Sequence, residues 1–118
     1  MIYLRDKVQI FVSLQPIDAR KSIDGLCAMV LDYIGENPQC GNVFLFFNKT
    51  RDKVKLLWWD VNGFVLHYKR LERHRFVVPK LQDVDKLEIT QTQLQGLLAG
   101  LDFSLMRHFP EINYHQYA

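Results

Sequence analysis

Apolar residues recur at helical spacing in two stretches of the chain. In the first they occupy positions i, i+3, i+4, i+7, i+8 and i+11, namely Ile23, Leu26, Cys27, Val30, Leu31 and Ile34. This stripe predicts a helix near residues 20–34, with Asp18 as its N-cap and Gly35 as a left-handed residue at its end. A second helix is expected near residues 91–99, because a Thr-x-x-Gln capping box at Thr90 precedes leucines at helical spacing.

Shorter apolar runs predict the strands of a sheet, over residues 8–14, 43–48, 53–59 and 64–70. Because short polar links that suit hairpins join the last three, these strands are expected to form an antiparallel meander. A short edge strand is expected over residues 76–79, and the polar residues Asp83, Asp85 and Glu88 are expected in a link. The pattern therefore predicts one α+β domain, an antiparallel β-meander with two main helices that cover one face.

The link Asp60-Val61-Asn62-Gly63 predicts the register of the central hairpin. It suits a three-residue loop that ends with Gly63 in the left-handed region, so that Asp60 faces Phe64 and Lys55 faces Lys69. One face would then belong to the core, with Val54, Leu56, Trp58, Phe64, Leu66 and Tyr68; Phe76 is also expected in the core. The other face would carry Lys53, Lys55, Leu57, Trp59, Val65, His67 and Lys69.

Length and composition fit a single domain. The chain has 118 residues, 48% of them hydrophobic, which is enough for one core in residues 1–103. The aromatic tail at 104–118 has no clear period, so packing on the domain and binding to a partner both stay open. No apolar window is long enough for a membrane-spanning helix, and Cys27 and Cys40 match neither a disulfide framework nor a zinc site. We therefore expect a soluble, cytoplasmic protein.

The net charge is only +2, but cations are concentrated in the middle of the chain. Between residues 49 and 75 they are Lys49, Arg51, Lys53, Lys55, Lys69, Arg70, Arg73 and Arg75. Lysines that face each other across strands repel mildly unless an anion lies between them, and Trp59 beside them offers a surface on which a base can stack. This favours a sheet face that binds nucleic acid. The alternative is that these lysines are solvated and protect the sheet against aggregation.

Patterns typical of catalysis or metal binding are not apparent. The carboxylates lie mostly at predicted caps, turns and links rather than in a set that would converge on metal ions. The four histidines are scattered, and there is no glycine-rich phosphate loop or nucleophile elbow. The sequence therefore predicts no catalytic residue, no metal site and no cofactor.

Three blocks of the sequence carry a family resemblance. They are Asp18-Ala19-Arg20-Lys21-Ser22-Ile23-Asp24-Gly25-Leu26, then Lys55-Leu56-Leu57-Trp58-Trp59-Asp60 with Gly63-Phe64 and Tyr68-Lys69-Arg70-Leu71-Glu72-Arg73, and finally Leu97-Leu98-Ala99-Gly100-Leu101-Asp102. The first resembles an Asp-x-Arg-Lys-x-x-Asp-Gly-Leu signature of the accessory protein, often called TnpB, of the bacterial IS66 insertion-sequence family. The resemblance covers residues 8–103. It implies a non-catalytic protein of a mobile element that acts with a separate, larger transposase.

The first block extends the candidate site. Arg20 and Lys21 would lie in the first turn of a helix, where cations oppose the helix dipole and suit a bound anion. Gly25 indicates close packing, whereas Asp24 stays open between a pair with Arg20 and another role. The complete candidate nucleic-acid-binding set is Arg20, Lys21, Lys53, Lys55, Trp59, His67, Lys69, Arg70, Arg73 and Arg75.

Two functions remain open on the sequence. The first is binding of DNA, either the ends of the element or a displaced strand, through this cationic set. The second is a protein adaptor that docks on the transposase or its companion through the aromatic tail and any exposed part of Leu57, Trp59 and Val65. The oligomeric state is not predicted.

Overall fold

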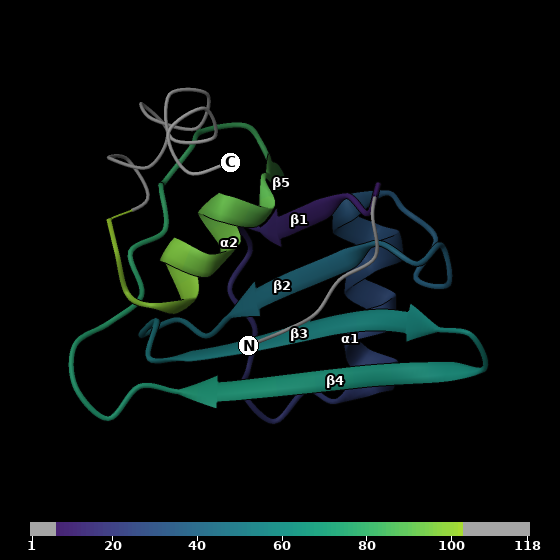
Figure 1. Cartoon of the computed structure of the whole chain (residues 1–118), viewed down its shortest axis with the longest axis horizontal. Helices are drawn as coiled ribbons and strands as arrows, with labels where there is room; N and C mark the ends of the chain where they lie inside the picture. The colour runs from purple at the N-terminus through teal and green to yellow at the C-terminus, as the bar shows by residue number, and fades with distance from the viewer. Residues whose placement is uncertain (1–6, 103–118) are drawn as a thin grey trace.

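The computed structural model describes residues 7–102, which form a five-stranded sheet with helices on both of its faces (Figure 1). In chain order the elements are β1 (Ile10–Ser13), α1 (Ile23–Met29), the π-helix η1 (Val30–Ile34), β2 (Val43–Phe47), β3 (Lys53–Asp60), β4 (Gly63–Arg70), β5 (Lys86–Ile89) and α2 (Gln91–Leu98). The predicted α+β class is confirmed. The aromatic tail at 104–118 lies outside the described residues.

The strand order in the sheet is β4-β3-β2-β1-β5. The predicted antiparallel meander of β2, β3 and β4 is confirmed. In contrast to the all-antiparallel prediction, β1 pairs in parallel with β2, because the chain crosses between them through α1 and η1. β5 pairs antiparallel with β1 and forms the second edge of the sheet.

The prediction of an edge strand at 76–79 is wrong, because these residues form no strand. The prediction of a polar link over residues 83–88 is also wrong in part, because β5 begins at Lys86 and forms an edge of the sheet. The backbone amide of Phe76 donates to the carbonyl oxygen of Arg51 at 2.8 Å instead of joining a strand ladder. Lys86 and Glu88 of β5 are exposed, as is common on edge strands, and they give this strand the polar composition of a link.

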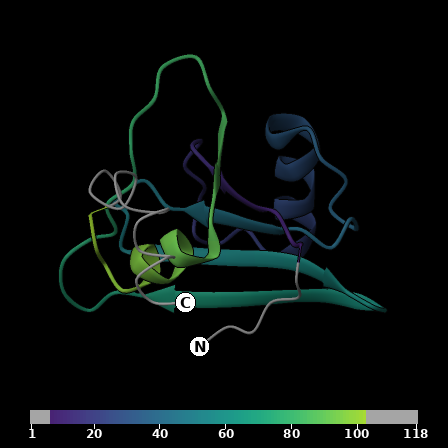
Figure 2. The same cartoon turned by 45° about the horizontal axis from the view of Figure 1, so that its top comes forward.

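The prediction that both helices cover one face is also wrong. The α2 face of the sheet buries Val54 and Leu56 together with Leu94 and Leu97, and the opposite face buries Leu57 with helical residues such as Leu26. Figures 1 and 2 show α1 and α2 on opposite sides of the strands. The continuous apolar run of β2 is buried at every position, as expected for a strand with both faces covered.

The helix ends predicted from the sequence agree with the structure at the end of the first helix and at the start of the second. Gly35 is left-handed with a φ of 73° at the end of η1, and Thr90 forms the predicted capping box with Gln93. The first helix also ends close to the predicted residue, Ile34, but it begins at Ile23, after an N-cap at Ser22 that makes no side-chain hydrogen bond. Asp18 is therefore not its N-cap.

The predicted hairpin register is wrong by one residue. Asp60 pairs with Gly63, so the loop contains only Val61 and Asn62, and Val61 rather than Gly63 is left-handed, with a φ of 53°. Shifting β4 by one residue turns each of its side chains to the other face. Phe64, Leu66 and Tyr68 therefore lie on the α1 face, away from Val54, Leu56 and Trp58.

The three predicted core aromatic residues have different environments. Phe76 is buried as predicted. Trp58 is partly buried and packs against the core on the α2 face. Tyr68 is 50% exposed near the outer end of β4, so its assignment to the core is wrong.

Candidate nucleic-acid interface

The two lysines predicted to face each other lie on opposite faces of the sheet. Lys55 is opposite Tyr68, whereas Lys69 is opposite Val54. Nζ of Lys55 donates hydrogen bonds of 2.6 Å to the carbonyl oxygens of Ala19 and Lys21, in the loop before α1. Nζ of Lys69 donates a hydrogen bond of 2.6 Å to the carbonyl oxygen of Leu98 at the end of α2. The Lys55 ammonium group therefore holds the loop before α1 to the sheet, and that of Lys69 holds the end of α2.

Three other predicted cations are paired with carboxylates. Arg20 contacts Asp18 at 2.8 Å, Lys53 contacts Asp52 at 3.1 Å, and Arg70 contacts Glu72 at 3.0 Å. Hydrogen bonds from Arg20 hold the pKa of the Asp18 carboxyl well below its ordinary value. The side chains of the Arg20 pair and the Arg70 pair are more than half exposed, so they contribute little to stability.

The argument from the helix dipole does not apply to Arg20 and Lys21, because both residues precede α1. Lys21 is exposed, and its aliphatic stem lies where a Cβ on Gly25 would reach it at 3.3 Å. The close packing expected at Gly25 is thus with this side chain. Arg20 binds Asp18 rather than Asp24.

The remaining predicted residues are also distributed over separate surfaces. Trp59 packs edge-on against Phe64, with 5.0 Å between ring centroids, on the α1 face. His67 is exposed on the other face of β4. Arg73 and Arg75 are exposed in the loop that follows β4. The structure therefore does not bring the predicted set together on one sheet face.

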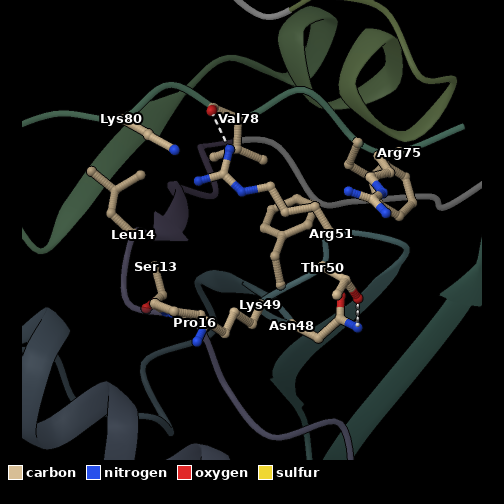
Figure 3. Close-up of a pocket in the computed structure, with 12 residues that line it drawn as sticks. Ser13, Leu14, Pro16, Asn48, Lys49, Thr50, Arg51, Arg75, Val78 and Lys80 are labelled. Carbon is tan, nitrogen blue, oxygen red and sulfur yellow. Dashed lines mark hydrogen bonds between the residues drawn. The ribbon is translucent and has the colours of Figure 1, made fainter.

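A different group of cations lines a cleft at the end of the sheet, which we call the basic cleft (Figure 3). The cleft has a volume of about 450 Å³ and lies where β1 and β2 end. Its cationic residues are Lys49, Arg51, Arg75 and Lys80. Its other lining residues are Ser13, Leu14, Pro16, Phe47, Asn48, Thr50, Phe76 and Val78.

The turn between β2 and β3 presents two of these cations. Asn48 is buried, and its side-chain amide donates to Thr50 at 3.0 Å and to Asp52 at 2.6 Å, while its oxygen accepts from the backbone amide of Lys53 at 3.0 Å. This network fixes the turn, in which Arg51 takes a left-handed φ of 60°. Because the turn is tight, Lys49 and Arg51 both border the cleft.

The loop at 71–80 supplies the other two cations. Two hydrogen bonds hold this loop to the turn. The backbone amide of Phe76 donates to the carbonyl oxygen of Arg51, and Nη1 of Arg51 donates to the carbonyl oxygen of Val78 (Figure 3). The buried side chains of Phe76 and Val78 anchor the loop in the core. Arg75 and Lys80 are exposed beside these anchors and face the same cleft.

The basic cleft carries unneutralised positive charge. Its lining contains no aspartate or glutamate, and none of its four cations forms an ion pair with a carboxylate within residues 7–102. Lysine and arginine side chains gathered in this way attract anions, and arginine in particular matches the oxygen pattern of phosphate. The cleft is thus suited to phosphate groups.

Of the four cleft cations, only Arg75 belongs to the predicted site. Lys49 and Arg51 belong to the group of cations between residues 49 and 75. The predicted site does not include them, because the expected hairpin register places Lys55 and Lys69 opposite each other instead. Lys80 has no signal in the sequence, because its place depends on how Phe76 and Val78 anchor the loop. In the part of the chain that the structure describes, no group of histidine, cysteine and acidic residues could hold a metal ion. No described helix is long and apolar enough to cross a membrane.

Comparison with known proteins identifies relatives over most of the chain. The family described as "IS66 Orf2 like protein" matches residues 8–108. Two uncharacterized proteins of Sinorhizobium fredii are similar: y4jC, 33% identical over 103 residues and 87% of each chain, and y4hO, 32% identical over 96 residues, 81% of this chain and 83% of the other. No solved structure matches the chain significantly.

Proposed function

The chain belongs to the IS66 Orf2-like family, and we propose that it is a non-catalytic accessory protein of transposition that binds DNA through the basic cleft. Family membership associates the chain with an insertion sequence. The proposal includes DNA binding, the ends of the element as the target, a cytoplasmic location and cooperation with a separate transposase.

The observation that carries the proposal is the contrast between the four cleft cations and five cations of the set predicted from the sequence. Arg20, Lys53 and Arg70 are neutralised by carboxylates, and Lys55 and Lys69 are satisfied by backbone carbonyls. Among the residues that the structure describes, no carboxylate pairs with the four cleft cations to offset their mutual repulsion. A phosphate group would provide the missing negative charge, and phosphate contacts supply most of the affinity of proteins that bind DNA without reading its sequence.

The proposal is tested by removing two cleft charges, with a matched change elsewhere. Lys49→Gln with Lys80→Gln removes cations whose ammonium groups form no hydrogen bond or ion pair within residues 7–102, so the variant should fold like the parent. Lys7→Gln with Lys21→Gln removes the same charge from two exposed lysines outside the cleft. Binding of labelled duplex and single-stranded oligonucleotides is measured by fluorescence anisotropy between about 50 and 200 mM salt.

The expected result is specific to the cleft variant. Its affinity should fall for all sequences alike, and the slope of log affinity against log salt should shrink by about 2, one for each lost phosphate contact. The control variant should keep a slope close to that of the parent. Equal losses in the two variants would show that only net charge matters, and no binding of the parent to either oligonucleotide at low salt would contradict the proposal.

A further inference from the structure

A second hollow lies at the other end of the sheet, and we call it the helix groove. Its volume is about 720 Å³, and the residues that matter most in its lining are Asp24, Cys27, Leu31, Glu36, Pro38 and Phe64. Phe64 pairs with Trp59 near the end of β3, so the helix groove lies beyond the start of the antiparallel neighbour β2. The basic cleft lies at the opposite end of β2, beyond Phe47. Separate ligands can therefore occupy the two sites at the same time.

The lining of the helix groove also contains the apolar side chains of Leu31 and Phe64. Leu31 is 58% exposed, although it continues the apolar stripe of the helix, and Phe64 is only partly buried against the core. Burial raises the pKa of the Cys27 thiol, and the nearby charge of Asp24 raises it further, so the thiol is neutral at physiological pH. Exposed apolar side chains that adjoin a hollow are typical of protein-docking surfaces.

The lining of the helix groove contains two acidic residues, Asp24 and Glu36. From Ser22 to Asn48 the sequence contains no lysine, arginine or histidine, while Asp24, Asp32 and Glu36 are acidic. Glu36 lies 3.8 Å from Nζ of Lys86, but Asp24 has no ionic partner among the described residues. This charge repels a nucleic-acid backbone and complements a cationic partner.

We propose that the helix groove docks a cationic amphipathic segment of a partner protein, with an apolar side chain against Leu31 and Phe64 and a lysine or arginine beside Asp24. An amphipathic helix laid in an apolar groove is a common way for proteins to recognise one another. A cationic segment of a partner protein would complement the acidic Asp24, which has no ionic partner within residues 7–102. The proposal is independent of DNA binding by the cleft.

The test uses the full chain and a labelled model peptide. The peptide is an amphipathic helix with leucines on one face and lysines on the other. The variant Asp24→Asn with Leu31→Gln changes one acid and one exposed apolar residue of the groove. Its matched control, Asp83→Asn with Val84→Gln, makes the same kinds of change in an exposed loop, where Val84 is 46% exposed. Peptide binding is measured by fluorescence anisotropy.

The groove variant should bind the peptide about tenfold more weakly than the parent, because it loses an apolar anchor and a charge contact together. The control should bind like the parent, and a peptide with glutamate in place of lysine should not bind. Equal binding by both variants, or equal binding of both peptides, would overturn the proposal. A parent that sediments as a dimer, with the groove variant as a monomer, would assign the groove to a second copy and also overturn it. The DNA affinity of the groove variant should be unchanged, which separates this proposal from the first.

Discussion

Lys69 of β4 caps the end of α2, because its Nζ donates a hydrogen bond of 2.6 Å to the carbonyl oxygen of Leu98. The last carbonyls of a helix have no partner within the helix, and a lysine can satisfy one of them. Lys55 holds the loop before α1 in a similar way from the other face of the sheet, and Lys86 donates to the carbonyl of Ile34 at 2.9 Å. Lys69 and Lys86 thus hold helix ends to strands, and Lys55 holds the loop that leads into α1.

Replacing Lys69 should reduce stability and leave DNA binding intact. Lys69→Met keeps the aliphatic stem but removes the donor, and we expect the free energy of unfolding to fall by about 0.5–1.5 kcal/mol. The exposed Lys7→Met should change it much less. Urea denaturation measures both. A loss of DNA affinity without any loss of stability would return Lys69 to the binding site, as the sequence suggested.

Removing either Leu56 or Leu57 should be strongly destabilising, although the two residues are adjacent on one strand. Both are fully buried, one beneath α2 and the other beneath α1 and η1. Leu56→Ala and Leu57→Ala should each lower the free energy of unfolding by about 2–5 kcal/mol. Leu31→Ala, the same change at a 58% exposed position, serves as the control. A sheet covered on one face only would make one of the two leucine changes nearly neutral in a denaturation experiment.

The capping box at Thr90 should stabilise α2. The Thr90 hydroxyl accepts from the amide of Gln93 at 3.1 Å, and the Gln93 side chain accepts from the amide of Thr90 at 2.8 Å. Thr90→Ala should cost about 1 kcal/mol, which a thermal melt detects as a lower Tm. Thr92→Ala changes the same residue type inside the helix, at an exposed position, and should be close to neutral. Similar melting of the two variants would show that the cap contributes nothing.

Stability should fall in acid because of Asp52. Hydrogen bonds from Asn48, Thr50 and Lys53 hold the pKa of this carboxyl well below its ordinary value. The stability that the ionised group contributes is fully present above the unfolded-state pKa of about 4, and it is lost as the pH falls from there towards the lower folded-state pKa.

The variant Asp52→Asn tests this contribution by urea denaturation between pH 6 and pH 2, about the range over which the carboxyl titrates in the two states. It should be less stable than the parent near neutral pH and should lose less stability on acidification. Asp83→Asn, in an exposed loop, should follow the parent over the whole range. A curve for Asp52→Asn that runs parallel to the parent's would show that other carboxylates, such as Asp18, account for the loss in acid.

The sequence predicted the meander and both helices because their patterns are long and periodic. It did not predict the hairpin register, since a valine in the left-handed region is sterically unfavourable, and Gly63 looked like the natural residue for that position. The choice of Gly63 shifted β4 by one residue and placed Lys55 opposite Lys69. The prediction of a nucleic-acid-binding site on one sheet face, with Lys55 opposite Lys69, depended on that single turn.

Other features depend on contacts that no local pattern records. The site of Arg51, Arg75 and Lys80 forms only when a loop after β4 folds back on the turn before β3. The helices on two faces, by contrast, had a signal in the unbroken apolar run Val43–Phe47, which is typical of strands covered on both sides.

The position of β1 inside the sheet has a consequence for how the protein acquires its structure. The first strand is bordered by β2 on one side and by β5 on the other, and Gln9 approaches Glu88 across 79 residues of sequence at 3.4 Å. During synthesis on the ribosome, one edge of β1 cannot form its hydrogen bonds with β5 until almost the whole domain has emerged. Contacts so distant in sequence slow folding, typically to the millisecond-to-second range for proteins dominated by them. The nascent chain consequently exposes an apolar strand edge for longer than a chain whose neighbouring strands are consecutive, and β5 and α2 complete the fold from its C-terminal side.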